Sequence, residues 1–200
     1  GFKNVHALPP SHCGFVRDGS VEVKRYLPAG RHGASFDAEP KIETSFEDAA
    51  KHVRELLDES VRLRMIADVP VGTFLSGGID SSAVACLMAK RSASSIKTFT
   101  MGFPSFGYDE RAEARALATT LGAEHHEFEA RPAEALRVID DVLDAYQAPF
   151  ADASAIPTYL LARETRRHVK AVMTGDGGDE LFGGYRRYRY FAKALRWRAL

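Results

Sequence analysis

The chain contains 200 residues, of which 45% are hydrophobic and 27% charged, a composition typical of a folded globular domain and not of a disordered or fibrous chain. Lysine and arginine total 27, as do aspartate and glutamate, so the overall charge favours no particular polyanionic partner, and we expect nucleic acid to be an unlikely one. Two scattered cysteines, Cys13 and Cys86, give neither a disulfide framework nor a zinc site, and no apolar run approaches the ~20 residues of a membrane span, so we expect a cytoplasmic protein.

Residues 1–43 differ in sequence pattern from the rest of the chain. Short extended runs at residues 13–16 and 21–23 flank Asp18-Gly19, a pair that favours a tight β-hairpin turn. Residues 28–35 have the composition of a linker. Because a lone two-stranded hairpin is marginal in water, we expect this segment to belong to another domain or to pack on the residues after position 43.

From residue 44 the apolar residues follow a helical period. Thr44 or Ser45 offers an N-cap, and residues 68–70, which end in a proline, close the helix. Apolar residues that recur at steps of three or four predict one buried face: Phe46, Ala49, Ala50, Val53, Leu57, Val61 and Met65.

The rest of the chain alternates apolar runs with helical patterns. We predict strands at residues 71–75, 96–103, 125–129 and 170–174. We predict helices at residues 80–91, 109–121, 132–146 and 155–167, and from residue 185 onward. Gly122 caps the second of these helices and Pro132 begins the third. Strands that alternate with helices imply parallel βαβ units, so residues 44–200 are predicted to form a doubly wound parallel α/β domain.

The first predicted strand runs into Ser76-Gly77-Gly78, and a helix with Asp80 in its first turn comes next. First-turn N–H groups without partners, together with the helix dipole, attract an anion, and the glycines let the backbone come close to it. The alternative is a glycine-rich connection without a ligand. The acid and the adjacent Ser81 and Ser82 favour phosphate binding over that alternative.

A second glycine-rich loop comes after the last predicted strand and carries Asp176 and Asp179. If the first and last strands are neighbours at the switch point of the sheet, Asp80 and Asp179 face each other across one crevice. Carboxylates in that position can hold Mg²⁺, which takes only one or two protein oxygens besides phosphates and waters. The alternative for this loop is a flexible turn. Neither a Walker loop nor a dinucleotide fingerprint is present.

At these residues the sequence resembles a known family. Residues 76–82 look like the pyrophosphate loop (PP-loop) of ATP pyrophosphatases. Together with residues 68–72 and 174–185 they resemble the synthetase domain of glutamine-dependent asparagine synthetases, and residues 99–103 and 125–127 match the intervening pattern. The resemblance implies a sheet of the adenine nucleotide alpha hydrolase-like type over residues 44–200.

Residues 1–43 resemble the tail of the glutaminase domain that precedes this domain in the family. The family's N-terminal nucleophilic cysteine is absent, since Gly1 begins the chain and Cys13 lies inside the predicted hairpin. A lysine that the family carries further along would lie beyond Leu200. We therefore expect a piece of a longer protein, with domains at 1–43 and 44–200. A homodimer is left open.

The resemblance implies a reaction in two steps. A carboxylate, aspartate in the type enzyme, attacks the α-phosphorus of ATP and releases pyrophosphate, with Mg²⁺ as the metal. Ammonia from the glutaminase domain then displaces AMP and leaves an amide. The product is a carbon–nitrogen bond, so the implied enzyme is an amidotransferase and ligase.

The resemblance also implies roles for single residues. Asp80 and Asp179 would hold the magnesium ion, and Asp176 occupies the position of a family glutamate that acts near the adenylate and the incoming ammonia. The residues that would cradle the β- and γ-phosphates are Ser76, Gly77, Gly78, Ser81 and Ser82. Those that would contact the nucleotide through the adenosine pocket or the backbone are Phe74, Leu75, Met101, Thr174 and Gly175.

Two departures from the family bear on the acceptor. Asp176 is one methylene shorter than the family glutamate, and residues 150–154 lack the threonine and arginine of the enteric and eukaryotic loop. That arginine would clamp the α-carboxylate of aspartate. Related bacterial amidotransferases that act on sugar or polymer carboxylates share such sequences, so these acceptors stand beside aspartate as the alternative.

Other functions compete with this one. A PP-loop ATPase that modifies tRNA would use the basic helix after Tyr185, although no cysteine is placed for sulfur transfer. We favour instead an amphipathic helix that turns its aromatic residues inward and leaves its arginines in solvent, or that packs on a missing C-terminal part. A non-catalytic nucleotide-binding regulator is the third possibility. Adjacent His125 and His126 on a strand point to opposite faces and do not predict a metal site. The charged residues of the second helix read as an exposed face: Glu110, Arg111, Glu113 and Arg115.

Overall fold

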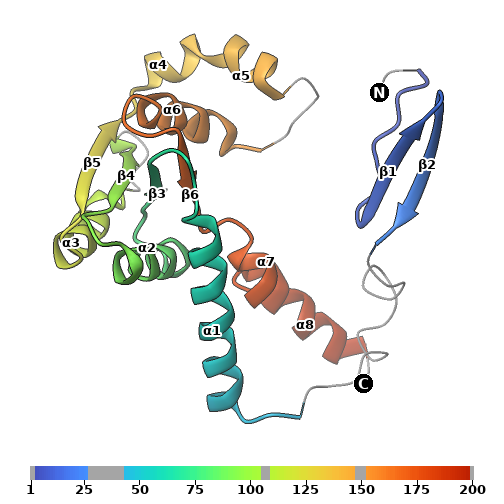
Figure 1. The fold of residues 1–200 in the computed structure, drawn as a ribbon, viewed down its shortest axis with the longest axis horizontal. Coiled ribbons are helices and arrows are strands. Elements are labelled where there is room, and N and C mark those ends of the chain that lie inside the picture. Colours follow the sequence, from blue (N-terminus) through green and yellow to red (C-terminus); the bar gives the residue numbers. More distant parts are fainter. Residues whose placement is uncertain (1–2, 27–42, 105–108, 147–151, 199–200) are drawn as a thin grey trace. The chain divides into compact units, whose positions relative to one another are not determined.

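The computed structural model describes residues 3–26, 43–104, 109–146 and 152–198 (Figure 1). By its contacts the chain divides into two units, Gly1–Ala49 and Ala50–Leu200. In the first unit, β1 (His12–Arg17) pairs antiparallel with β2 (Ser20–Arg25). Asp18 and Gly19 form the turn with φ of 49° and 76°, so the predicted hairpin is confirmed. The predicted linker at 28–35 lies outside the described residues, and the domain boundary at 43 stays a prediction.

The second unit is built on a four-stranded sheet in the order β5-β4-β3-β6, with every pairing parallel. Its strands are β3 (Val71–Phe74), β4 (Lys97–Gly102), β5 (Glu124–Glu129) and β6 (Ala171–Met173). The chain builds outward from β3 to β5 and then crosses back to add β6 on the other side of β3. The switch point therefore lies between β3 and β6.

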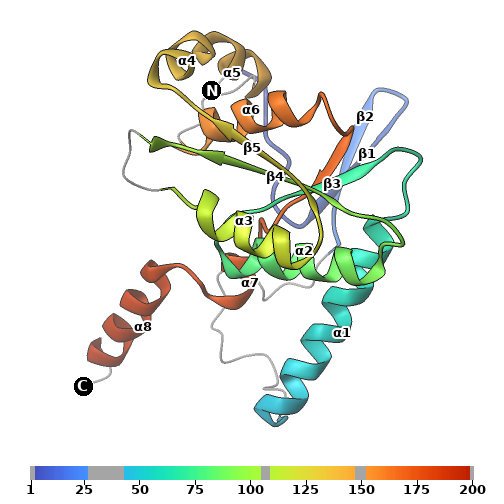
Figure 2. The same cartoon turned by 90° about the vertical axis from the view of Figure 1, so that its left-hand side faces the viewer.

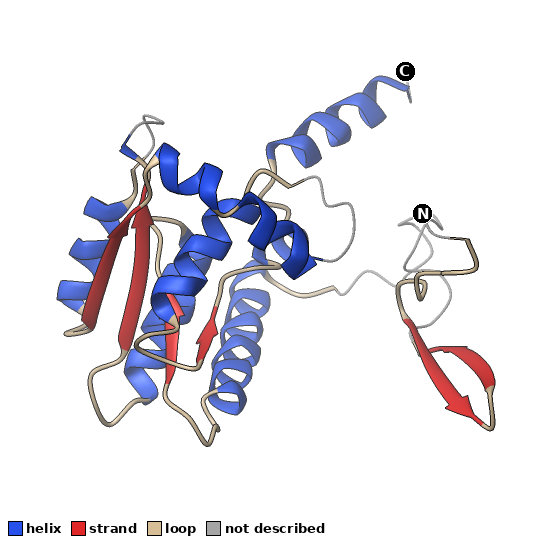
Figure 3. Ribbon diagram, turned by 90° about the horizontal axis from the view of Figure 1, so that it is seen from above, coloured by secondary structure: helices blue, strands red, loops and turns tan. Residues whose placement is uncertain are grey.

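Helices cover both faces of the sheet, which confirms the predicted doubly wound arrangement. One face carries α2 (Ile79–Arg91) and α3 (Arg111–Thr120), and the other carries α6 (Ala155–Thr165) with two short helices above it (Figures 2 and 3). Gly122, with φ of 61°, lies just past the end of α3 as expected of a C-terminal cap. Among the described residues, no helix is long and apolar enough to cross a membrane.

Each face has its own apolar core. On the α2 and α3 side, Leu75 and Met88 pack with the alanines of both helices, at 2% and 1% exposure. On the α6 side, Leu160 packs with Val138 and Val142. Gly72 in β3 leaves room for the fully buried ring of Phe99, since a Cβ there would lie 2.5 Å from Phe99 Cε2. The strands are thus held between two separate apolar layers.

The first helix, α1 (Phe46–Arg64), begins as predicted and is buried less than predicted. The Asp48 amide donates to Ser45 Oγ at 3.0 Å, which confirms the N-cap. Of the predicted buried face, however, only Val61 is fully buried, and Phe46 is 83% exposed. The C-terminal half packs on α2, where Asp58 and Arg91 form a bidentate ion pair. The N-terminal half extends beyond that contact.

Three further elements differ from the predictions. The single helix expected at 132–146 is two helices, α4 (Pro132–Arg137) and α5 (Ile139–Tyr146). They are interrupted at Val138, whose side chain is 2% exposed in the second core. A short helix, α7 (Gly178–Phe182), begins inside the predicted second loop. The last helix, α8 (Arg186–Arg198), forms as expected, but Tyr188, Tyr190 and Phe191 are exposed and not inward.

The adjacent histidines of β5 point to opposite faces, as the strand period predicts. His126 stacks on Phe99, and on the other face His125 Nδ1 lies 2.7 Å from Thr98 Oγ1. His125 Nε2 is buried without a hydrogen bond, although Glu127 Oε1 lies 3.4 Å away. Burial lowers the pKa of His125, and the nearby Glu127 carboxylate opposes this shift only in part. His125 is therefore held in its neutral form.

This burial predicts a pH dependence of stability. The pKa of His125 is lower in the folded chain than in the unfolded chain. As the pH falls through about 6.5, the unfolded chain therefore binds a proton at residue 125 before the folded chain does, and the free energy of unfolding should fall. Urea unfolding measured from about pH 7.5 to about pH 5 should show a smaller loss for His125→Asn than for the unchanged protein. His52→Asn, at a side chain 71% exposed, is the control and should keep the original slope. An unchanged slope in His125→Asn would contradict the assignment.

Candidate active site

A cavity of ≈ 400 Å³ opens at the carboxyl ends of β3, β4 and β6. It lies beside the switch point, where open α/β sheets bind ligands. The predicted site residues that line it are Phe74, Leu75, Ser76, Gly78, Asp80, Ser81, Met101, Thr174, Gly175, Asp176 and Asp179. Two other predicted residues, Gly77 and Ser82, are not part of the described lining. The structure thus gathers residues that are more than a hundred positions apart in sequence, such as Phe74 and Asp179.

The loop between β3 and α2 is folded onto the first turn of that helix. Ser76 Oγ lies 2.8 Å from Ser81 Oγ, and the Gly78 amide donates to Ser76 Oγ at 3.1 Å. Ser82 Oγ donates to the Gly78 carbonyl at 2.7 Å, and Ser82 is not part of the described lining. Gly78 is the N-cap of α2 and provides no side-chain cap. The positive end of a 13-residue helix therefore faces the loop.

The two glycine-rich loops touch each other, and two glycines make the contact possible. A Cβ at Gly175 would lie 2.7 Å from the Ser81 amide nitrogen, and one at Gly178 would lie 2.7 Å from Asp80 Oδ2. A side chain at 175 would press on the backbone of the first loop, and one at 178 would press on the Asp80 carboxylate. Glycine at 175 and 178 is therefore what allows Asp80 to lie against the β6–α7 loop.

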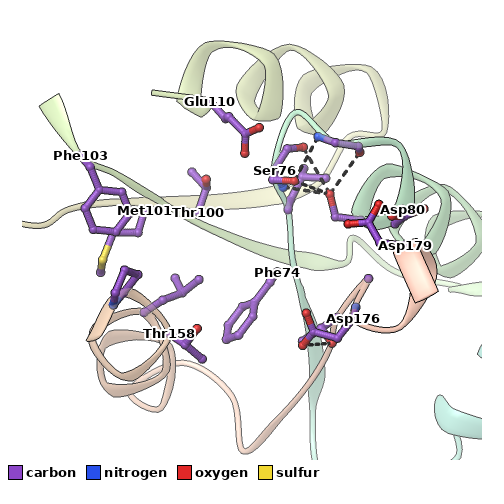
Figure 4. A pocket seen from close by; sticks show the side chains of 17 residues that line it. Phe74, Ser76, Asp80, Thr100, Met101, Phe103, Glu110, Thr158, Asp176 and Asp179 are labelled. Carbon is purple, nitrogen blue, oxygen red and sulfur yellow. Dashed lines mark hydrogen bonds between the residues drawn. The ribbon is translucent and has the colours of Figure 1, made fainter. Parts of the chain in front are cut away.

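The two carboxylates predicted to hold magnesium lie at one end of the cavity. Figure 4 shows Asp80 and Asp179 together at that end, with Ser76 next to them. Among the described residues, no three His, Cys, Asp or Glu side chains form a metal-binding group. Two carboxylates nevertheless suit Mg²⁺, whose remaining ligands are phosphate oxygens and waters. The donor set and the close approach at Gly178 both fit that ion.

Asp176 lies apart from the two metal-site acids in Figure 4. Thr174 Oγ1 donates to Asp176 Oδ2 at 2.9 Å, and the Asp176 amide donates weakly to the same hydroxyl at 3.4 Å. The side chain is otherwise exposed. The Thr174 hydroxyl therefore holds the carboxylate near the end of β6, at the rim of the cavity.

The opposite end of the cavity is apolar. Phe103 and Met101 lie there in Figure 4, across from Asp80 and Asp179, with Phe74 between them. Pro157 and Leu161 of α6 complete the lining. A ligand with one planar apolar part and one polyanionic part matches this division.

Sequence reasoning missed six lining residues: Thr100, Phe103, Glu110, Pro157, Thr158 and Leu161. Thr100 and Phe103 could have been found, since they end a predicted strand on the carboxyl side. Those of α6 depend on how that helix crosses the sheet, which no local pattern reveals. The prediction that Glu110 lies on an exposed helix face is wrong. Glu110 is half-buried and lines the cavity, because α3 begins beside Gly77.

Gly178→Ala should separate stability from ligand binding. Gly178 is the first residue of α7 and does not have a positive φ, so alanine fits its backbone and the thermal midpoint should change little. The added methyl group would displace the Asp80 carboxylate, and Mg²⁺-dependent binding of ATP should weaken about 10- to 100-fold. Isothermal titration calorimetry checks this. Gly14→Ala, whose Cβ would meet only Leu8 Cδ1 at 3.8 Å, is the control. Unchanged ATP affinity in Gly178→Ala would refute the placement of Asp80.

Comparison with known proteins gives a consistent match. Residues 52–200 match the family model described as asparagine synthase. The chain is 38% identical over 181 residues to glutamine-hydrolyzing asparagine synthetase 1 of Bacillus subtilis, a match that covers 90% of this chain and 27% of the relative. It is 40% identical over 154 residues to a putative glutamine-hydrolyzing asparagine synthetase of Mycobacterium tuberculosis, covering 77% of this chain and 24% of the relative.

A solved structure, the NH3-dependent NAD synthetase of Campylobacter jejuni, is similar at a TM-score of 0.42 and 20% identity, covering 71% of this chain and 61% of that one. The chain spans about a quarter of the length of the two curated relatives, 27% and 24%. The family model, in contrast, covers most of the chain and includes both glycine-rich loops. The chain belongs to the asparagine synthase family.

Proposed function

We propose that this chain forms the ATP-dependent part of an amidotransferase that adenylates a carboxylate, releases pyrophosphate and then forms an amide with ammonia. The observation that carries the proposal is the contact between the two glycine-rich loops at the switch point, which places Asp80 beside Gly178. Membership of the asparagine synthase family supports the same reaction class. The ammonia would come from a glutaminase domain of the same protein, in the cytoplasm.

The polar end of the cavity suits the triphosphate. Amides and hydroxyls of residues 76–82 would bind the β- and γ-phosphates, which leave as pyrophosphate. Asp80 and Asp179 would hold Mg²⁺, which when bound neutralises the charge that develops on the leaving group. The first-turn amides and the dipole of α2 already point toward this loop, so they would need little reorganisation as charge develops.

The apolar end suits the adenosine. Phe74, Leu75 and Met101 would surround the base and ribose, and Thr174-Gly175 would meet the nucleotide through the backbone. This orientation leaves the α-phosphorus between the two ends, near the rim where Thr174 holds Asp176. The acceptor carboxylate would reach the α-phosphorus from that rim. Asp176 would then be placed to accept a proton from the incoming ammonia.

Aspartate is the first acceptor to consider, and the alternative is a sugar or polymer carboxylate. The charge of the cavity favours testing the alternative. Its described lining contains acids and no lysine, arginine or histidine, and residues 105–108 and 147–151 contain none either. In the part of the loop that is described, Asp152 Oδ1 accepts hydrogen bonds from the Ser154 amide and hydroxyl. Residues 150 and 151 lie outside the described part.

We expect the protein to release pyrophosphate from ATP only when Mg²⁺ and a carboxylate acceptor are present. Asp80→Asn should slow this release about 100-fold or more, because it removes a charge that holds the metal. Coupled pyrophosphate detection with ammonia supplied measures the rate. Asp140→Asn, at an exposed acid of α5, should leave it unchanged. Formation of ADP and phosphate would contradict the proposed reaction.

An acceptor screen separates the two candidate substrates. Without a cation for a second carboxylate, a uronic acid or a carboxylated polymer should support pyrophosphate release with a higher kcat/KM than aspartate. The same assay measures all three acceptors under identical conditions. A clear preference for aspartate would show that the missing cation comes from residues outside this chain, and would exclude the alternative.

A further inference from the structure

The guanidinium of Arg111, the first residue of α3, binds two carboxylates. Arg111 Nε donates to both carboxylate oxygens of Asp109 at 2.9 and 3.0 Å, and Nη2 donates to Asp109 Oδ2 at 2.6 Å. Arg111 Nη1 lies 3.4 Å from Glu129 Oε2 at the end of β5. One guanidinium thus joins the start of α3 to the end of the outermost described strand.

The Arg111 side chain lies close against Gly102 of β4, and the glycine makes this possible. A Cβ at Gly102 would lie 2.5 Å from Arg111 Cζ and 2.6 Å from Arg111 Cδ. Gly102 does not have a positive φ, so an alanine would fit the backbone and would only displace Arg111. The Gly102 carbonyl also accepts from the Ala130 amide at 3.0 Å. Gly102 is therefore the surface on which Arg111 rests.

Arg111 sits between two residues that line the cavity. Phe103 comes directly after Gly102, and Glu110 directly precedes Arg111. The hydrogen bonds from Arg111 lower the pKa of Asp109, and those to Asp109 raise the pKa of Arg111. Both groups therefore keep their charges at neutral pH. The contact is 22% and 33% exposed at its two side chains, so it is partly shielded from water.

We propose that Arg111 is a positioning residue for nucleotide binding, which holds Phe103 and Glu110 against the nucleoside end of the cavity by resting on Gly102 and pairing with Asp109 and Glu129. This inference depends on the proposed function, because it assumes that the cavity binds ATP. It adds a role for residues that no family resemblance assigned. We call Arg111 with its three contacts, Gly102, Asp109 and Glu129, the Arg111 clamp.

The same helix provides a matched control. Arg115 lies one turn further along α3 and donates to Glu127 of β5 through Nε and Nη2, at 2.6 Å each. This pair also joins α3 to β5, and neither residue is in the described lining of the cavity. Loss of Arg115 should therefore show whether any ion pair between α3 and β5 affects ATP binding, or only the pair that Arg111 forms with Glu129.

The test is steady-state pyrophosphate release by the full-length protein with MgATP, ammonia and the best acceptor. Arg111→Met and Asp109→Asn should each raise the KM for ATP about five- to tenfold with kcat nearly unchanged, since they weaken ground-state binding without touching the reacting atoms. Arg115→Met should leave the KM for ATP unchanged. Thermal midpoints of all variants show whether each one is folded.

A double substitution tests the Gly102 contact. Gly102→Ala should raise the KM for ATP in the unchanged background, because it displaces Arg111. In an Arg111→Ala background the same change should add nothing, because the space is already vacated. Additive effects would overturn the role of Gly102.

An unchanged KM for ATP in folded Arg111→Met and Asp109→Asn, or an equal rise in Arg115→Met, would overturn the clamp. If the unchanged protein releases no pyrophosphate and binds no ATP, the proposed function fails instead, and the clamp with it.

Discussion

The parallel pairing of β3 with β6 is the contact on which the site depends. These strands are a hundred residues apart in sequence, and they align Val71 with Ala171 and Thr73 with Met173. Buried Thr73 adds a side-chain hydrogen bond to the Met173 carbonyl at 3.1 Å. Because both strands end at the same edge, their loops emerge together. Asp80 and Asp179 meet only because of this pairing, since each is otherwise an acid in a separate glycine-rich loop.

The charge of the cavity imposes a second constraint. Its described lining holds the carboxylates of Asp80, Glu110, Asp176 and Asp179 and no basic side chain. The side-chain charges alone would repel a nucleoside triphosphate from such a site. The attraction would come from backbone amides, the α2 dipole and bound cations, and the acids would act by collecting those cations. This source of positive charge differs from that of a Walker site, where a lysine provides the charge.

Local chemistry explains what could be predicted from the sequence. The Asp18-Gly19 turn, the Ser45 cap and the strand–glycine–helix run at 71–82 are set by neighbouring residues, and all three form as expected. What failed depends on tertiary packing. The helix predicted at 132–146 is interrupted at Val138, which is buried in a core that α6 helps to form. Glu110 looked like a surface acid because the sequence does not show that α3 begins beside Gly77.

The length of β6 has a consequence for how binding is measured. It is the shortest strand of the described sheet, three residues against four to six in the others, and its first residue is exposed. It pairs with β3 at three aligned positions, and each loop of the site follows directly from one of these two strands. A ligand that binds both loops would link the ends of the two strands. Its measured affinity would therefore include any stabilisation of their pairing.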